Sequence, residues 1–146
     1  MGRLLALDVG RKRTGIAVTD ILQIVPGGLG FQPTYQVAAW VREYCTSEPV
    51  DAIIVGQPKQ VDNTPSESMK YIVPVVNRLR KLLPGMSIIP YDERFTTVMA
   101  ERAMIVGGVP KMKRREKGLA DEISAVIILR DFMESRAYEE YKLSKS

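Results

Sequence analysis

The sequence predicts a single α/β domain in which a mixed five-stranded sheet has helices on both faces. Two apolar segments, residues 3–9 and 14–19, are separated only by a turn at residues 10–13. Strands joined this closely form a hairpin and run antiparallel. Helical and extended patterns then alternate along the chain, which is typical of a sheet covered by helices. The opening hairpin and the lack of a G-x-G-x-x-G motif argue against a purely parallel dinucleotide-binding sheet.

The remaining elements follow in a regular order. Residues 27–31 suggest a turn into a third strand, which completes an antiparallel set of three. Thereafter the apolar periodicities predict helices and strands in turn, with Pro74 implying a kink in the second helix. The predicted ranges are a helix at 36–45, a strand at 50–56, a helix starting at 66 and stopped by Pro84-Gly85, a strand at 86–91, and helices at 97–106 and 119–133.

Length and composition favour one globular domain. Of 146 residues, 45% are apolar and 26% charged, which is ordinary for a folded protein. We expect the domain to cover residues 1–135, followed by a polar C-terminal tail at 136–146 that frays. No apolar run approaches the ~20 residues that cross a membrane, and the apolar start is interrupted by Asp8, too early for a signal peptide. A cytoplasmic location is therefore expected.

The chain contains no histidine and a single cysteine, Cys45. The absence of histidine excludes Ser-His-Asp and Cys-His catalysis as well as zinc-histidine hydrolysis. Cys45 lies in an apolar helical pattern and is expected to be a buried structural thiol. Any hydrolytic chemistry would therefore depend on carboxylates, lysines or metal ions held by oxygen ligands.

Positive charge is concentrated in two segments. The net charge is +4, and the segment 111–117 alone carries five cations against Glu116. A second cluster, residues 11–13, adds three more positive charges. Basic clusters on a slightly acidic body indicate a polyanionic partner, although a solvated loop would have the same composition. The cations of the first segment are Lys111, Lys113, Arg114, Arg115 and Lys117.

Three acidic residues stand where local structure does not require them. Asp8 ends an apolar strand, although aspartate is uncommon in strands. Glu93 follows the fifth strand, and Asp121 lies in the first turns of the last helix. Turn formation, helix capping or the helix dipole would each explain one of them alone. Because they are far apart in sequence, only the fold can assemble them.

If the three carboxylates converge, they suit Mg²⁺ or Mn²⁺, which prefer oxygen ligands and also bind substrate phosphates. Two such ions can activate water and stabilise the leaving oxygen when a phosphodiester is hydrolysed. This chemistry needs no histidine, and the basic segments would attract the nucleic acid.

Four motifs resemble the YqgF/RuvX family of Holliday-junction resolvases and pre-16S rRNA nucleases, and the resemblance covers nearly the whole chain. In order they are Ala6-Leu7-Asp8-Val9-Gly10-Arg11-Lys12-Arg13-Thr14-Gly15-Ile16-Ala17, Val55-Gly56-Gln57-Pro58-Lys59, Asp92-Glu93-Arg94-Phe95-Thr96-Thr97, and the run from Lys117 to Leu129. The third is the most specific, being close to the family's D-E-R-L-T-T. The resemblance implies a ribonuclease H-like fold with Asp8, Glu93 and Asp121 as catalytic, metal-holding acids.

Further roles follow from this resemblance and from charge. Lys12, Arg13, Lys59 and Arg94 are expected to contact nucleic acid together with the basic segment 111–117. Arg94 would equally suit a structural ion pair. The chain departs from the family at Gln60 and Asn63, where asparagine and glycine are usual, and at Phe95 and Ser124. None of these departures touches the three acids.

The implied activity is metal-dependent cleavage of structured nucleic acid, most specifically of the 5′ end of pre-16S rRNA, with four-way DNA junctions as the alternative substrate. Two other functions remain open. The hairpin at Asp8 also resembles the phosphate loop of actin-like and sugar kinases, although those enzymes use two such domains. A non-catalytic nucleic-acid-binding module would explain the basic segments, but clustered carboxylates would repel phosphate without a metal. A monomer or a homodimer would suit the chain.

Overall fold

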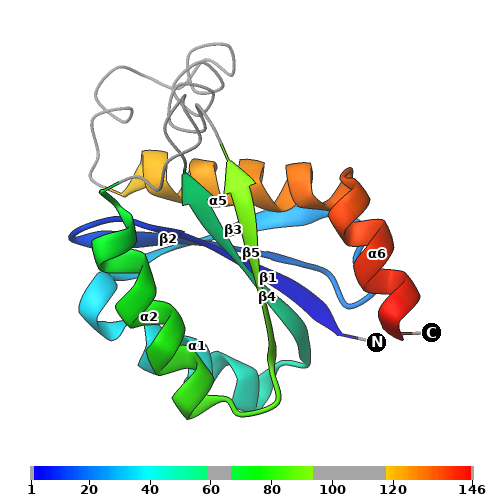
Figure 1. The fold of residues 1–146 in the computed structure, drawn as a ribbon, viewed down its shortest axis with the longest axis horizontal. Coiled ribbons are helices and arrows are strands. Elements are labelled where there is room, and N and C mark those ends of the chain that lie inside the picture. Colours follow the sequence, from blue (N-terminus) through cyan, green and yellow to red (C-terminus); the bar gives the residue numbers. More distant parts are fainter. Residues whose placement is uncertain (1, 59–66, 94–117, 146) are drawn as a thin grey trace.

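A computed structural model of the protein, describing residues 2–58, 67–93 and 118–145, contains a five-stranded mixed sheet between two layers of helices (Figure 1). The strand order is β3-β2-β1-β4-β5. β1 pairs antiparallel with β2, and β2 with β3, whereas β1, β4 and β5 run parallel. The predicted fold class is confirmed. The strands are β1 (Arg3–Val9), β2 (Arg13–Thr19), β3 (Pro26–Pro33), β4 (Val50–Pro58) and β5 (Ser87–Glu93).

The helices divide between the two faces of the sheet. α1 (Thr34–Ser47) and α2 (Met69–Leu82) cover one face. α5 (Leu119–Met133) crosses the other face, and α6 (Arg136–Lys145) packs beside its end. Two separate apolar cores result, one on each side of the sheet.

The central position of β1 follows from its sequence. Residues 4–7 are all fully buried, because neighbouring side chains of a strand point to opposite faces and both faces are covered. Leu5 and Leu7 pack under α1 and α2, while Leu4 and Ala6 pack under α5. Four consecutive buried apolar residues are typical of a strand that is covered on both faces.

Pro74 lies inside α2, as its position in the sequence predicted. Val75 is buried beside Ile72 and Leu79, whereas Val73 is 45% exposed. On the two sides of the proline, Val75 is therefore the valine that packs into the core. Cys45 is half-buried against the core beneath α1, and burial raises the pKa of its thiol. A raised pKa keeps this thiol protonated and unreactive.

The expectation of a frayed C-terminal tail is wrong, because residues 136–145 form α6. Tyr138 is only 7% exposed and packs near Phe132. Its hydroxyl donates a 2.7 Å hydrogen bond to Oε1 of Gln23, whose Nε2 donates to the carbonyl of Gly2. The tail was predicted to fray because most of its residues are polar. Tyr138 and Tyr141, three residues apart on one helical face, nevertheless pack against the core.

Two predicted segments lie outside the described residues: the helix at 97–106 and the basic segment at 111–117. No helix in the described ranges is long and apolar enough to cross a membrane.

Candidate active site

Two of the predicted acids lie at the same edge of the sheet. β1, β4 and β5 are parallel, so their C-terminal ends meet at one edge, where Asp8 and Glu93 are found. The prediction placed Asp92 and Glu93 just after the fifth strand. They are instead its last two residues, because β4 continues to Pro58 and provides partners for both.

Asp8 faces α5. Leu4 and Ala6 point into the core beneath α5, and strand alternation puts Asp8 on the same face. Asp8 is half-buried, and its cross-strand partner on β2 is Gly15. The carboxylate therefore lies beside the point where β2 meets the first turn of α5.

Gly15 allows that first turn to come unusually close. A Cβ atom built at position 15 would overlap the backbone carbonyl of Asp121. The start of α5 thus rests on the backbone of β2, directly across the hairpin from Asp8. The backbone of Asp121 therefore lies at the cross-strand neighbour of Asp8, although the two residues are near opposite ends of the sequence.

Arg13 contacts Asp121 in the same place. Its Nε lies 3.4 Å from Oδ2 of Asp121, and the two side chains are 34% and 30% exposed. Arg13 precedes Gly15 by two residues and so shares its face of β2. Sequence analysis predicted a nucleic-acid contact for Arg13 and gave no sign of this ion pair, which depends on the packing of α5.

Glu122 has a different environment from its neighbour Asp121. Its Oε2 accepts a 2.7 Å hydrogen bond from the backbone N–H of Gly30. A Cβ at Gly28 would lie 2.5 Å from the same oxygen, so a larger residue there would displace the Glu122 side chain. Glu122 therefore joins α5 to the edge strand β3, whereas Asp121 contacts Arg13 on β2.

The start of α5 is fixed by a further close approach. Gly118, the N-cap residue, has φ +93, a conformation that favours glycine. A Cβ at this position would overlap the ring of Phe31 on β3. Gly118 and Gly15 together determine where α5 begins and how closely it packs against the sheet.

The other predicted site residues are only partly described. Lys12 is exposed in the β1–β2 hairpin. The backbone of Glu93 is placed by β5, but its side chain is outside the described part of the chain. Within that part, no three His, Cys, Asp or Glu residues form a group suited to a metal ion. The predicted residues Lys59, Arg94, Lys111, Lys113, Arg114, Arg115 and Lys117 lie outside the described ranges.

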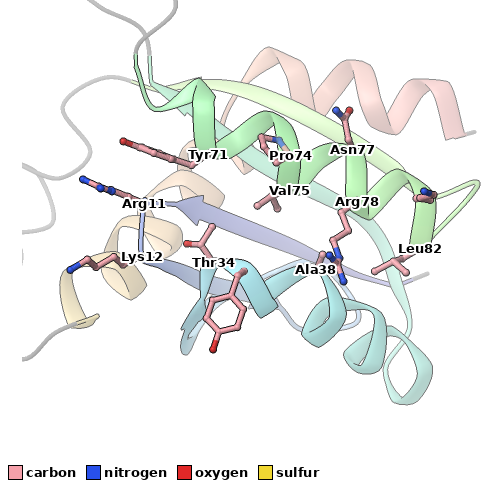
Figure 2. Close-up of a pocket in the computed structure, with 12 residues that line it drawn as sticks. Arg11, Lys12, Thr34, Ala38, Tyr71, Pro74, Val75, Asn77, Arg78 and Leu82 are labelled. Carbon is pink, nitrogen blue, oxygen red and sulfur yellow. The ribbon is translucent and has the colours of Figure 1, made fainter.

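A groove lies between α1 and α2, on the face opposite α5, and was not predicted from the sequence. Its volume is about 1000 Å³. Arg11 and Lys12 lie at one end, and Arg78 and Leu82 lie toward the other (Figure 2). The spacing of Arg78 and Lys81, three residues apart on a helix, is the only sequence signal that would have indicated a shared basic face.

The strand order, the acidic sheet edge and α5 lying across one face of the sheet define a protein of the ribonuclease H-like fold. A family model for RuvX, described as Holliday junction resolvase, matches residues 2–135. The chain belongs to this RuvX family.

Relatives and a solved structure agree with this assignment. A protein of Parabacteroides distasonis is 50% identical over 95% of this chain and 99% of its own length. One from Phocaeicola vulgatus is 52% identical over 94% and 99%. Both are named "Putative pre-16S rRNA nuclease". RuvC of T. thermophilus in complex with a Holliday junction substrate has a TM-score of 0.54 at 16% identity, covering 92% of this chain and 95% of that one. This last similarity shows the fold.

Proposed function

We propose that this protein is a divalent-metal-dependent nuclease that hydrolyses phosphodiester bonds in structured RNA, processing the 5′ end of pre-16S rRNA. One observation carries the proposal. The backbone of Asp121 contacts Gly15, the cross-strand partner of Asp8, and Asp8 lies at the sheet edge where β5 also ends. Membership of a nuclease family and the name shared by the relatives support the reaction class and the substrate.

The chemistry of the available donors fits Mg²⁺ or Mn²⁺. Asp8, Asp121 and Glu93 would supply oxygen ligands only, the kind that both ions prefer. When bound, the metal would lower the pKa of a water molecule and stabilise the leaving oxygen. No histidine exists in the chain, and Cys45 lies on the other face of the sheet, so the site has no donor that favours zinc.

The position of residue 93 is compatible with this role. Leu7, Val55 and Pro90 form one row across the three parallel strands. Residue 93 is thus two strands from Asp8 and two residues further along, or about 10 Å across and about 7 Å along the sheet. A metal site between them would favour the longer glutamate side chain at position 93.

Arg13 would position Asp121 and balance its charge. A carboxylate held by a guanidinium keeps its orientation, and one Arg side chain offers five N–H donors. Arg13 can therefore contact Asp121 and a substrate phosphate at once. Lys12, Lys59, Arg94 and the basic segment 111–117 would contact the nucleic-acid backbone, which attracts the substrate without reading its sequence.

We place the nuclease domain in residues 1–135, the range that the family model nearly fills. α6 then packs against the end of this domain through Tyr138 and Phe132. A cytoplasmic monomer or homodimer acting on ribosomal RNA precursors is the arrangement we favour.

A paired cleavage assay tests the proposal. Purified protein is incubated with a structured pre-16S leader RNA and with a four-way DNA junction, in Mg²⁺, in Mn²⁺ and in EDTA. We expect metal-dependent cleavage of the RNA and none by Asp8→Asn. Cleavage of the junction alone would show that DNA, not RNA, is the substrate. Full activity in EDTA would refute the metal mechanism.

A further inference from the structure

The groove between α1 and α2 combines cations with apolar and aromatic surface. It is lined from α1 by Thr34, Tyr35 and Ala38, from α2 by residues between Tyr71 and Leu82, and from the hairpin by Arg11 and Lys12. Figure 2 shows Arg11, Lys12 and Tyr71 at one end and Arg78 with Leu82 toward the other. Its volume of about 1000 Å³ is at the upper limit of ordinary ligand pockets.

The charge of the groove selects an anion. Arg11, Lys12, Arg78 and Lys81 line it, and no carboxylate does so among the described residues. All four side chains belong to exposed residues. In addition, α1 begins at the groove with no acidic residue in its first turn, so its dipole also favours negative charge there.

The lining of the groove also offers surface that suits a planar ring. Tyr35 is 77% exposed, and it projects from the first turn of α1. Pro74 and Val75 of α2 form apolar wall opposite α1. Aromatic rings within a cationic groove are the combination that proteins use to bind unpaired nucleotides, because every base has a flat face that can stack.

Hydrogen bonds join the start of α1, at the groove, to the hairpin beside the sheet edge where Asp8 lies. The Thr34 hydroxyl donates a 2.7 Å hydrogen bond to the carbonyl of Gly10, and its N–H donates to the carbonyl of Lys12 at 2.9 Å. The hairpin that these bonds hold also carries Asp8 and Arg13 on the face toward α5. A strand lying in the groove would therefore leave it at the edge where the acids lie.

We infer that this groove binds an unpaired, single-stranded segment of the nucleic acid, with phosphates near the cations and a base against Tyr35. The inference rests on the proposed nuclease function and adds that the substrate carries a single-stranded segment beside the cleaved bond. A duplex would fit poorly, because its bases are stacked inside and offer no free face to Tyr35.

Equilibrium binding tests this role without cleavage. Fluorescence anisotropy in EDTA compares a labelled oligoribonucleotide of about 12 nucleotides, within the usual site sizes, with the same strand in a duplex. The variants are Tyr35→Leu, Tyr35→Phe and the double substitution Arg78→Gln/Lys81→Gln. The matched control, Lys142→Gln/Lys145→Gln, removes two charges with the same spacing from α6, on the opposite face. Thermal unfolding confirms that each variant is folded.

We expect Tyr35→Leu to weaken single-strand binding between about fivefold and a hundredfold, the usual range for loss of one stacked base. Tyr35→Phe should retain the affinity, and duplex binding should not change. Arg78→Gln/Lys81→Gln should reduce the salt slope by up to about 1.4, or about 0.7 for each phosphate that is no longer neutralised. The control should leave the slope unchanged.

Equal losses for single strand and duplex, or no loss in any groove variant, would overturn the inference. Tight binding of adenosine monophosphate or ATP that the groove variants abolish, with oligonucleotide binding unaffected, would make the groove a small-molecule site instead. The cleavage assay with Mg²⁺ is read separately. Groove-dependent binding without any cleavage would refute the nuclease function and leave the groove's role intact.

Discussion

The backbone carbonyl of Asp121 occupies the space into which a side chain at position 15 would project. Gly15 is also the cross-strand partner of Asp8. A single residue without a side chain thus sets the distance between the first strand and the last long helix. The glycine acts on the site through the seating of α5, since it has no functional group of its own.

Gly15→Ala should consequently damage both stability and activity. Overpacking of this kind costs about 1–3 kcal/mol, and each kcal/mol lowers Tm by about 2–4 °C in a protein of this size. A displacement of Asp121 by about 1 Å would reduce cleavage on the order of a hundredfold. Gly27→Ala is the matched control, because nothing lies within 4 Å of a Cβ there. Identical melting curves and rates for the two variants would contradict this reading of the contact.

Asp121→Asn and Glu122→Gln should separate the two neighbouring carboxylates. Asp121→Asn is expected to abolish cleavage and leave folding unchanged, as are Asp8→Asn and Glu93→Gln, because each removes a charge that would bind the metal in the proposed mechanism. Glu122→Gln should retain cleavage within a few-fold, since an amide oxygen still accepts from Gly30. Instead, we expect Glu122→Gln to lower the free energy of unfolding by about 0.5–1.5 kcal/mol. Single-turnover cleavage and urea unfolding measure the two effects. Inactive Glu122→Gln with active Asp121→Asn would reverse the assignment.

The sequence was sufficient for the fold class because its signals were local. Apolar runs gave the strands, and the short turn at residues 10–13 made the first pair antiparallel. The pairing of Arg13 with Asp121 could not be foreseen, since it depends on how closely α5 seats on β2. The structural role of Glu122 could not be foreseen for the same reason. Asp121 and Glu122 are adjacent acids in the sequence, and only the position of the β3 backbone shows which of them accepts its hydrogen bond. The groove was missed because its walls come from three separated segments.

Asp20 should contribute stability that depends on pH. Its carboxylate accepts hydrogen bonds from the backbone N–H groups of Val25, Ile24 and Leu22, and these bonds, Val25 first, hold its pKa below the ordinary 3.8. A depressed pKa adds stability that is complete above the unfolded value and is lost as pH falls through the folded value. Asp20→Ala should therefore be less stable than wild type at pH 7. The difference should shrink below about pH 4. Urea unfolding at pH 7, 5 and 3 measures it, and a constant difference would assign the loss to something other than charge.

The basic segment 111–117 should provide electrostatic affinity. Replacing Lys111, Lys113, Arg114, Arg115 and Lys117 with Ser or Gln should weaken binding and reduce the salt slope by up to roughly 3.5–4.5. The loss should be similar for different sequences, because phosphate contacts do not read bases. Binding isotherms at several salt concentrations measure the slope. An unchanged slope would indicate that the segment does not contact phosphates and that residues 11–13 and Lys59 form the binding surface instead.

The two faces of the sheet are covered at different times during synthesis. α1 and α2 are made between the strands they cover, whereas α5 and α6 follow all five strands. Leu4, Ala6 and Ala17 therefore remain without their covering helix until residues beyond 118 have emerged. At about 5–20 residues per second, the roughly 100 residues from β2 to α5 take about 5–20 s to translate. For the last part of that interval, after β5 has been made, the apolar residues of this sheet face still lack α5, and transiently exposed apolar surface of this kind is prone to aggregation.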